Sequence, residues 1–213
     1  MVWLVVDGKK IEAQEGENLL QVCLRNEIYI PNLCYLNTME KPHASCRLCF
    51  VELADKPKPV PSCTIPVKEG MIVRTDTPPV RRLQQTALRL LLSVHRAECR
   101  KCPSNRRCDL QKLARLLGVR LRPRRFKHID RDAGPAHTHP LIEYVTARCV
   151  LCGRCIHVCE RQHGKSFLTF AMRGFDTVIA SLPSAALDPL QCGACHACID
   201  ACPVSALLLR DPA

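Results

Sequence analysis

The chain has 213 residues, of which sixteen are cysteine and only 4% are aromatic. This composition argues against one large apolar core and favours several small modules that are stabilised by ligands bound to cysteine. The formal net charge of +11 initially suggests a polyanionic partner such as nucleic acid.

The N-terminal segment predicts a β-hairpin followed by a short helix. Residues 2–6 form an apolar, β-branched run, which is followed by the turn dipeptide Asp7-Gly8 and by a second strand around Ile11. A helix is expected over residues 18–25, with its apolar face supplied by Leu19, Leu20, Val22 and Cys23. We interpret Cys23 as a small buried apolar residue rather than a metal ligand.

Four cysteines after this helix have the spacing C-x11-C-x2-C-x13-C; they are Cys34, Cys46, Cys49 and Cys63. Strands are expected at residues 50–53 and 71–74, before Pro78 and Pro79 interrupt the chain. Four cysteines around one C-x2-C pair, on a long loop between a helix and a strand, suit a 2Fe-2S cluster. Zinc is the alternative, because the C-x2-C pair is also half of a zinc site.

A helix predicted over residues 80–96 leads into the pattern H-x3-C-x2-C-x5-C. The members of this pattern are His95, Cys99, Cys102 and Cys108. His95 precedes Cys99 by four residues, close to one helical turn, so both side chains can point toward the same metal. The pattern favours a 4Fe-4S cluster with three cysteine ligands and one histidine ligand. The alternatives are a zinc site, or a histidine that is only a surface group or a helix cap.

A short helix is expected over residues 109–117, and a basic run follows from Arg120 to Arg131. This run is rich in cations and poor in apolar residues. Two interpretations of it stay open: a solvated linker, or a docking edge for an acidic partner or for phosphate groups.

The last third of the chain contains two cysteine runs of identical spacing, C-x2-C-x2-C-x3-C, which is typical of bacterial two-cluster ferredoxins. In such runs the fourth cysteine binds the other cluster. One 4Fe-4S cluster is therefore assigned to Cys149, Cys152, Cys155 and Cys202, and the other to Cys192, Cys195, Cys198 and Cys159. Disulfides or zinc fit two identical runs poorly. Short strands are expected between the runs, at residues 167–169 and 177–180.

The predicted ligands number sixteen, because all sixteen cysteines except Cys23 are assigned and His95 is added. They suffice for one 2Fe-2S cluster and three 4Fe-4S clusters with four ligands each. Such clusters would add a charge of about −7 and leave a net charge of roughly +4. The basic residues are also not interleaved with aromatic side chains, as a base-stacking surface requires. We therefore expect no nucleic-acid partner.

Nothing in the sequence predicts export or membrane insertion. The apolar run at residues 2–6 is too short for a signal peptide, and no run approaches the roughly eighteen apolar residues of a membrane-spanning helix. Cysteines in a reducing compartment bind metals more readily than they form disulfides. We expect a cytoplasmic protein with no membrane span.

The ordered set of motifs resembles the iron-sulfur electron-transfer subunits of NAD-linked oxidoreductases. It resembles above all the small diaphorase subunit of bidirectional nickel-iron hydrogenases. It is also similar to the N-terminal parts of the complex I large iron-sulfur subunit and of iron-only hydrogenases. The complex I subunit lacks the second complete ferredoxin run that this sequence contains.

The resemblance implies an α+β fold with three domains. The first would be a β-grasp 2Fe-2S ferredoxin-like domain at residues 1–78. The second, at residues 79–135, would be a small helical domain with a basic linker, and would hold the 4Fe-4S cluster that has one histidine and three cysteine ligands. The third would be a bacterial-type ferredoxin domain with two 4Fe-4S clusters at residues 136–213.

These expectations lead to the hypothesis that the chain relays single electrons inside a hetero-oligomer. The expected partners are a flavoprotein subunit that oxidises NAD(P)H and a catalytic oxidoreductase subunit. No G-x-G-x-x-G motif and no pair of nucleophile and base indicates a substrate site, so we expect an electron-relay subunit of an oxidoreductase complex without an active site of its own. A zinc-stabilised nucleic-acid-binding protein is the alternative function.

Overall fold

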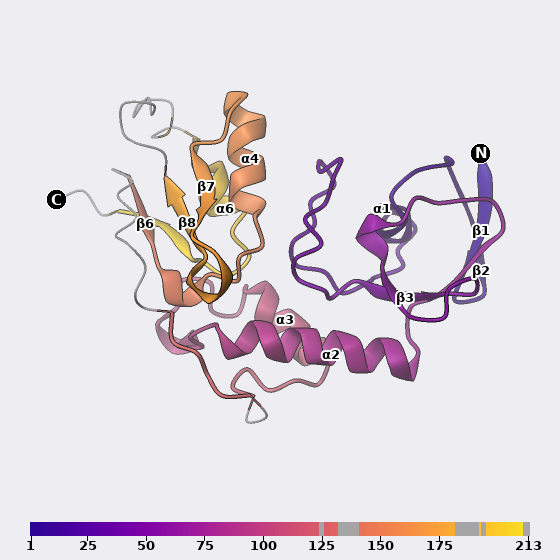
Figure 1. Cartoon of the computed structure of the whole chain (residues 1–213), viewed down its shortest axis with the longest axis horizontal. Helices are drawn as coiled ribbons and strands as arrows, with labels where there is room; N and C mark the ends of the chain where they lie inside the picture. Colours follow the sequence, from indigo (N-terminus) through magenta and orange to yellow (C-terminus); the bar gives the residue numbers. More distant parts are fainter. Residues whose placement is uncertain (124–125, 132–140, 182–191, 193–194, 211–213) are drawn as a thin grey trace. The chain divides into compact units, whose positions relative to one another are not determined.

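The computed structural model describes residues 1–123, 126–131, 141–181, 192 and 195–210. Contacts divide the chain into two compact units, Met1–Leu90 with Leu113–Arg120, and Leu91–Lys112 with Leu121–Ala213. Each unit combines helices with strands (Figure 1). Among the described residues, no helix is both long enough and apolar enough to cross a membrane.

The first unit contains a five-stranded mixed sheet. Its strands are β1 (Val2–Val6), β2 (Lys9–Ala13), β3 (Phe50–Leu53), β4 (Val60–Pro61) and β5 (Met71–Arg74). The strand order is β2-β1-β5-β3-β4, in which β1 and β5 are parallel and the other neighbours are antiparallel. The predicted hairpin of β1 and β2 is confirmed. Its turn residues Asp7 and Gly8 have φ values of 50° and 81°, which suit the twist of a two-residue hairpin.

Helix α1 (Leu19–Arg25) supplies part of the apolar core of this unit. The helix begins after Asn18, whose Oδ1 accepts a hydrogen bond from the Gln21 N–H at 3.2 Å and so caps a free backbone donor. Alternate residues of β1 also enter the core, as expected for a strand with one buried face. Cys23 is fully buried in this core, which confirms its interpretation as a small apolar residue.

Helix α2 (Pro78–Ser93) begins two residues before its predicted start. Pro78 and Pro79 occupy its first turn, where a missing N–H group leaves no helical hydrogen bond unmade. The helix ends three residues before its predicted end, so His95 lies in the following loop rather than on the helix. Helix α3 (Asp109–Leu116) agrees with its prediction to within one residue.

The second unit contains two small antiparallel sheets. Its four strands are β6 (Ile142–Tyr144), β7 (Leu168–Ala171), β8 (Val178–Ser181) and β9 (Leu207–Leu209), with β6 paired to β9 and β7 paired to β8. The β7–β8 pair confirms the two predicted strands; β7 begins one residue and ends two residues later than predicted, and β8 is shifted by one residue. Helix α4 (Arg154–His163) packs against α6 (Ala197–Asp200) and against β7 (Figure 1).

Short 3-10 helices complete the framework around the cysteines. They are η1 (Ser62–Thr64), η2 (Cys99–Lys101), η3 (Thr146–Arg148) and η4 (Gly174–Asp176). The basic run is only partly described, because residues 124 and 125 lie outside the described residues. Within its described part, Arg122 and residues 127–130 are exposed, whereas Arg131 is buried. The last cation of the run is therefore part of the folded unit and not of a solvated linker.

Candidate metal centres

The four cysteines of the N-terminal pattern come together in the first unit. They are Cys34, Cys46, Cys49 and Cys63, and all four are buried. The Sγ atoms of Cys34 and Cys46 lie 3.4 Å apart, and the side chains of Cys49 and Cys63 are also hydrogen-bonded to each other. Cys63 interacts electrostatically with each of the other three, which places all four in one cluster of thiols.

Backbone contacts hold the second pair of these cysteines between β3 and η1. The N–H and hydroxyl groups of Ser62 both donate to the Cys49 carbonyl oxygen, at 2.9 and 2.8 Å. The Asn18 side-chain amide donates to the Cys63 carbonyl oxygen. The residue that caps α1 therefore also fixes the position of a predicted ligand.

Within each hydrogen-bonded pair of these cysteines, one thiol has a lowered pKa and the other a raised pKa. Hydrogen bonding with Cys46 lowers the pKa of Cys34 to about 5, and hydrogen bonding with Cys63 lowers the pKa of Cys49 to about 7. The pKa values of Cys46 and Cys63 are raised, chiefly by hydrogen bonding to the partner sulfur and then by burial. Two of the four thiols therefore ionise readily, and a bound cationic centre would stabilise all four as thiolates.

His95 is buried and is oriented by the backbone of η3. Its Nδ1 lies 2.8 Å from the carbonyl oxygen of Arg148, to which it donates a hydrogen bond. Burial is the main cause of a lowered pKa for His95, so the ring is neutral and Nε2 carries the lone pair. A histidine that binds a metal commonly donates its other ring N–H to a carbonyl oxygen in this way.

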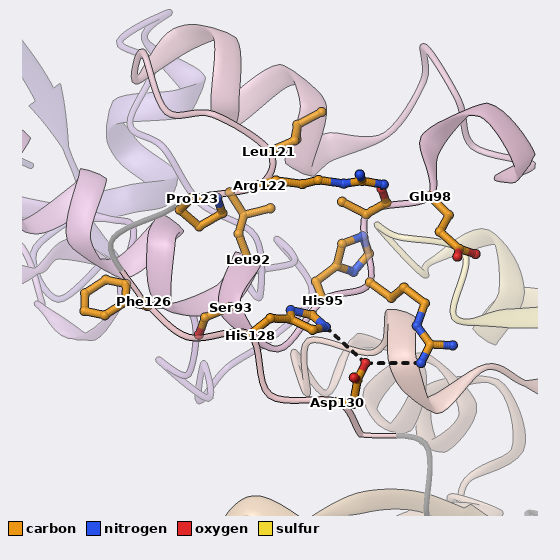
Figure 2. A pocket seen from close by; sticks show the side chains of 12 residues that line it. Leu92, Ser93, His95, Glu98, Leu121, Arg122, Pro123, Phe126, His128 and Asp130 are labelled. Carbon is orange, nitrogen blue, oxygen red and sulfur yellow. Dashed lines mark hydrogen bonds and ion pairs between the residues drawn. The ribbon is translucent and has the colours of Figure 1, made fainter.

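The cavity beside His95 contains an ion-pair network (Figure 2). Asp130 accepts from Arg96 at 3.1 Å and from His128 Nε2 at 3.3 Å. Glu98 and Arg122 line the same cavity (Figure 2). Both also line a neighbouring cavity that includes Cys99.

The three cysteines of the histidine pattern lie close to η2 and to the start of α3. The Cys102 N–H donates to the Cys99 carbonyl oxygen at 3.2 Å, and Cys108 is buried. Burial is the largest cause of the raised pKa of Cys108, and the charge of Cys102 contributes. The structure brings Cys102 and Cys108 together, whereas it places His95 and Cys99 on two neighbouring cavities. Ligation of one cluster by all four residues stays a prediction.

Two cavities in the second unit are each lined by four cysteines. The cysteines of the first cavity are Cys149, Cys152, Cys155 and Cys202. Those of the second cavity are Cys159, Cys192, Cys195 and Cys198. These are the two sets assigned from sequence spacing, including the exchange of Cys202 and Cys159 between the runs. The arrangement of the cysteines thus agrees with crossed ligation, and ligation itself stays a prediction.

The local backbone explains how the two runs form similar loops. Gly153 and His196 each follow the second cysteine of their run, and both have left-handed φ values, 76° and 48°. Each is also the residue immediately before a helix, α4 or α6. The chain therefore turns sharply after two cysteines and presents the third at the start of the helix.

Hydrogen bonds to sulfur and the donor set both fit iron-sulfur clusters at these cavities. Backbone N–H groups donate to Sγ of Cys149 at 3.4 Å, Cys159 at 3.3 Å and Cys202 at 3.2 Å. Desolvation raises the pKa values of Cys152 and Cys198 to about 12, so a nearby cationic centre would favour their thiolate forms. Among the described residues, no group of three His, Cys, Asp or Glu side chains could hold a single metal ion.

Sequence reasoning missed two side chains beside the first of these cavities. Tyr144 lines the cavity and hydrogen-bonds to the Cys149 side chain. Buried Arg131 donates to the Cys149 carbonyl oxygen at 3.3 Å. The basic character of the run that ends at Arg131 was visible in the sequence. Neither residue lies at a characteristic sequence separation from a cysteine that would connect the two.

Three domain families match successive parts of the chain. The 2Fe-2S iron-sulfur cluster binding domain matches residues 1–78. The NADH-ubiquinone oxidoreductase-G iron-sulfur binding region matches residues 84–122, and the ferredoxin-like domain of NADH-quinone oxidoreductase subunit 3 matches residues 139–208. The chain therefore contains iron-sulfur cluster binding domains similar to parts of these subunits. Its fold is mixed α and β and includes 2Fe-2S and 4Fe-4S ferredoxin-like domains.

Individual proteins similar to this iron-sulfur chain come from hydrogenases and from NADH-ubiquinone oxidoreductases. The NADP-reducing hydrogenase subunit HndD of Solidesulfovibrio fructosivorans is 32% identical over 99% of the chain. The NADH-ubiquinone oxidoreductase 75 kDa subunit of Reclinomonas americana is 34% identical over 97% of the chain. The chain spans about a third of the length of these relatives, 36% and 29% respectively.

A solved structure is similar over nearly the whole chain. It is a chain of the NAD+-reducing NiFe-hydrogenase in the H2-reduced state, with a TM-score of 0.81 and 26% identity. The match covers 98% of this iron-sulfur chain and 87% of the hydrogenase chain. The predicted resemblance is confirmed. The nucleic-acid-binding alternative finds no support, because all three matching families are iron-sulfur domains.

Proposed function

We propose that the chain carries single electrons between an NAD(P)H-oxidising flavoprotein subunit and a catalytic oxidoreductase subunit of a hetero-oligomer. The relatives named above are subunits of hydrogenases and of an NADH-ubiquinone oxidoreductase, which supports this placement. When bound, the clusters supply centres that accept and release one electron at a time.

The proposed cofactors are one 2Fe-2S cluster and three 4Fe-4S clusters. The 2Fe-2S cluster is held by Cys34, Cys46, Cys49 and Cys63. The three 4Fe-4S clusters are held by His95 with Cys99, Cys102 and Cys108, and by the two crossed sets of the ferredoxin runs. The neutral ring of His95 places one less negative charge on its cluster than a thiolate would.

The corresponding domain description is a β-grasp domain at residues 1–78, a small helical domain at residues 79–135 and a two-cluster ferredoxin domain at residues 136–213. The order of the five strands and the position of α1 support the first of these. The proposed boundary between residues 135 and 136 lies outside the described residues.

The observation that carries the proposal is the pair of cysteine-lined cavities that share helix α4. Cys155 lines one cavity and Cys159 lines the other, and they lie one turn apart on that helix. Four residues of α-helix rise about 6 Å, so α4 holds centres bound in the two cavities next to each other. A short separation is what successive one-electron transfers require.

Metal analysis of anaerobically purified protein tests the proposal. We expect about fourteen irons and as many acid-labile sulfides per chain, from one 2Fe-2S and three 4Fe-4S clusters. A folded, colourless protein that contains zinc in place of iron would refute the proposal.

Two double variants test the crossed ligation specifically. Replacing Cys149 and Cys202 by serine should remove one cluster, or about four irons, because both line the same cavity. Replacing Cys149 and Cys159, which lie in the same sequence run, is the matched comparison and should remove two clusters, or about eight irons. The opposite order of iron losses would show that each run binds its own cluster.

A further inference from the structure

Tyr144 is a half-buried phenol that lines the cavity formed by Cys149, Cys152, Cys155 and Cys202. It ends strand β6, and its hydroxyl oxygen accepts a hydrogen bond from the Ile179 N–H of β8 at 3.3 Å. The hydroxyl proton is directed to the Cys149 side chain, with which Tyr144 forms a hydrogen bond. An O–H group that donates to a thiolate stabilises the sulfur most when the charge on it is greatest.

Arg131 brings a buried positive charge to the same cysteine. Its side chain belongs to a residue only 9% exposed, and its guanidinium donates to the carbonyl oxygens of Cys149 and Thr177. Both of these acceptors are neutral. A buried guanidinium is costly unless a negative charge lies nearby. Among the described residues, the Cys149 thiolate is such a charge, because Arg131 acts to lower its pKa, and an anionic group bound there would add to it.

We propose that Tyr144 and Arg131 raise the reduction potential of the 4Fe-4S cluster held by Cys149, Cys152, Cys155 and Cys202. This inference rests on the proposed function and adds the residues that set the energy of one step in the relay. Hydrogen bonds to cluster sulfurs and nearby charge are two of the factors that determine such potentials.

The sign of the effect follows from the charge balance. A 4Fe-4S core of about +2 with four thiolates carries about −2, and one added electron makes this about −3. The electron comes from a reduced neighbouring centre of the chain, which is oxidised in the same step. The O–H donor and the guanidinium both interact more strongly with the more negative state. They therefore favour reduction.

Replacement of Tyr144 by phenylalanine tests the hydrogen bond with almost no change in side-chain volume. In a redox titration of the intact protein monitored by electron paramagnetic resonance, we expect one 4Fe-4S signal to shift. The ratio of reduced to oxidised cluster at a fixed potential should fall about tenfold, which corresponds to 59 mV for one electron. Tyr29→Phe is the matched control, because Tyr29 is exposed in the first unit. Unchanged potentials in Tyr144→Phe with full iron content would overturn the proposal.

A spectroscopic signature separates a direct hydrogen bond from a general effect on packing. Exchange into D2O should shift Fe–S(Cys) stretching frequencies in the resonance Raman spectrum, and part of this shift should disappear in Tyr144→Phe. An identical isotope shift in both proteins would contradict a Tyr144 hydrogen bond to the bound thiolate.

The charge of Arg131 is tested by comparing Arg131→Lys with Arg131→Gln. Lysine should keep the potential near that of the unaltered protein. Glutamine should either lower the potential or cause loss of this one cluster, because the bound anion loses its counter-charge. A glutamine variant that keeps the cluster at an unchanged potential would refute the role of Arg131.

Failure of this inference is distinguishable from failure of the proposed function. An unaltered protein without iron-sulfur signals would refute the proposed function before any variant is made. Unaltered signals that do not respond to changes at Tyr144 and Arg131 would leave the electron relay intact and refute only the inference.

Discussion

The two units of the chain stabilise their cysteines in different ways. In the first unit, the cysteines lie against a continuous apolar core built from β1, β2, α1 and β5, which also contains Cys49 and Cys63. In the second unit, two-stranded sheets surround cysteine-lined cavities, and one of the core clusters found there is centred on Cys159 and Phe167. Side-chain packing thus contributes more to the stability of the first unit, and ligand binding contributes more to that of the second.

This difference shows that clustered cysteines can be accommodated by two different ways of stabilising a fold. Two-stranded sheets are marginally stable alone and need packing against another element. In the ferredoxin region that element is α4 or α6, and these helices carry three cysteines of the cavities, Cys155, Cys159 and Cys198. The first unit instead has an apolar sheet face that would survive as a core without a metal.

Removal of iron should produce the largest difference between the two units. Chelation under anaerobic, reducing conditions is expected to abolish amide protection in β6, β7, β8 and β9, because structural metals contribute on the order of 10 kcal/mol to small domains. The amides of β1 and β5 should keep most of their protection. Hydrogen exchange followed by mass spectrometry measures both regions in one sample. Equal loss of protection in the two units would contradict the distinction.

Leu4→Ala should produce the next largest effect, and only in the first unit. Leu4 is 1% exposed in the middle of β1, so its truncation should lower the free energy of unfolding of this unit by about 2–5 kcal/mol. Urea unfolding followed by the fluorescence of Trp3, the single tryptophan, reports on the same strand. The matched control Ile72→Ala removes a half-exposed side chain of β5 and should change stability by less than about 0.5 kcal/mol. A similar loss in both variants would argue against the core as the stabilising element.

Glu17→Gln should have the smallest effect and a defined pH dependence. Hydrogen bonds from Arg25 are the main cause that lowers the pKa of Glu17, with the two pairs of atoms 2.7 and 3.1 Å apart. Because the pKa of Glu17 is lower in the folded state, its carboxylate stabilises the fold at every pH above the ordinary glutamate pKa. This contribution is lost as the pH falls through the lower pKa of the folded state. The ion pair is solvent-accessible, so the loss at neutral pH should stay below about 1 kcal/mol. The difference from unaltered protein, measured by the same Trp3 unfolding assay, should shrink below about pH 4.5; a constant difference would exclude the ionised carboxylate as its cause.

Local signals allowed much of the fold to be predicted. The Asp7-Gly8 turn located a hairpin, and the apolar positions between Leu19 and Cys23 located α1. Long-range pairing was not predictable in the same way. β6 and β9 have three residues each and are joined only in the folded unit, so no periodicity in the sequence identifies them as partners. The prolines at the start of α2 were interpreted as a break, although the first helical turn accepts proline.

The candidate metal centres show the same contrast between local features, which the sequence predicts, and long-range contacts, which it does not. The spacing of the two runs predicted which cysteines gather at each cavity, because the distance between ligands along the chain is a local property. The positions of Tyr144 and Arg131 beside Cys149 depend on how β6, β8 and the basic run fold together. Such neighbours have no fixed spacing from the cysteine. The residues proposed to adjust a bound cluster were therefore not predictable from the sequence, whereas the cysteines proposed as its ligands were.

The exchange of Cys159 and Cys202 between the two cavities also constrains the order of biosynthesis. A ribosome that has translated the chain as far as α4 has made four cysteines of the ferredoxin region, yet neither cavity has its full set. Only after Cys202 has emerged are both sets complete. With the proposed ligation, maturation factors can therefore complete neither cluster of this region before the second cysteine run has been synthesised.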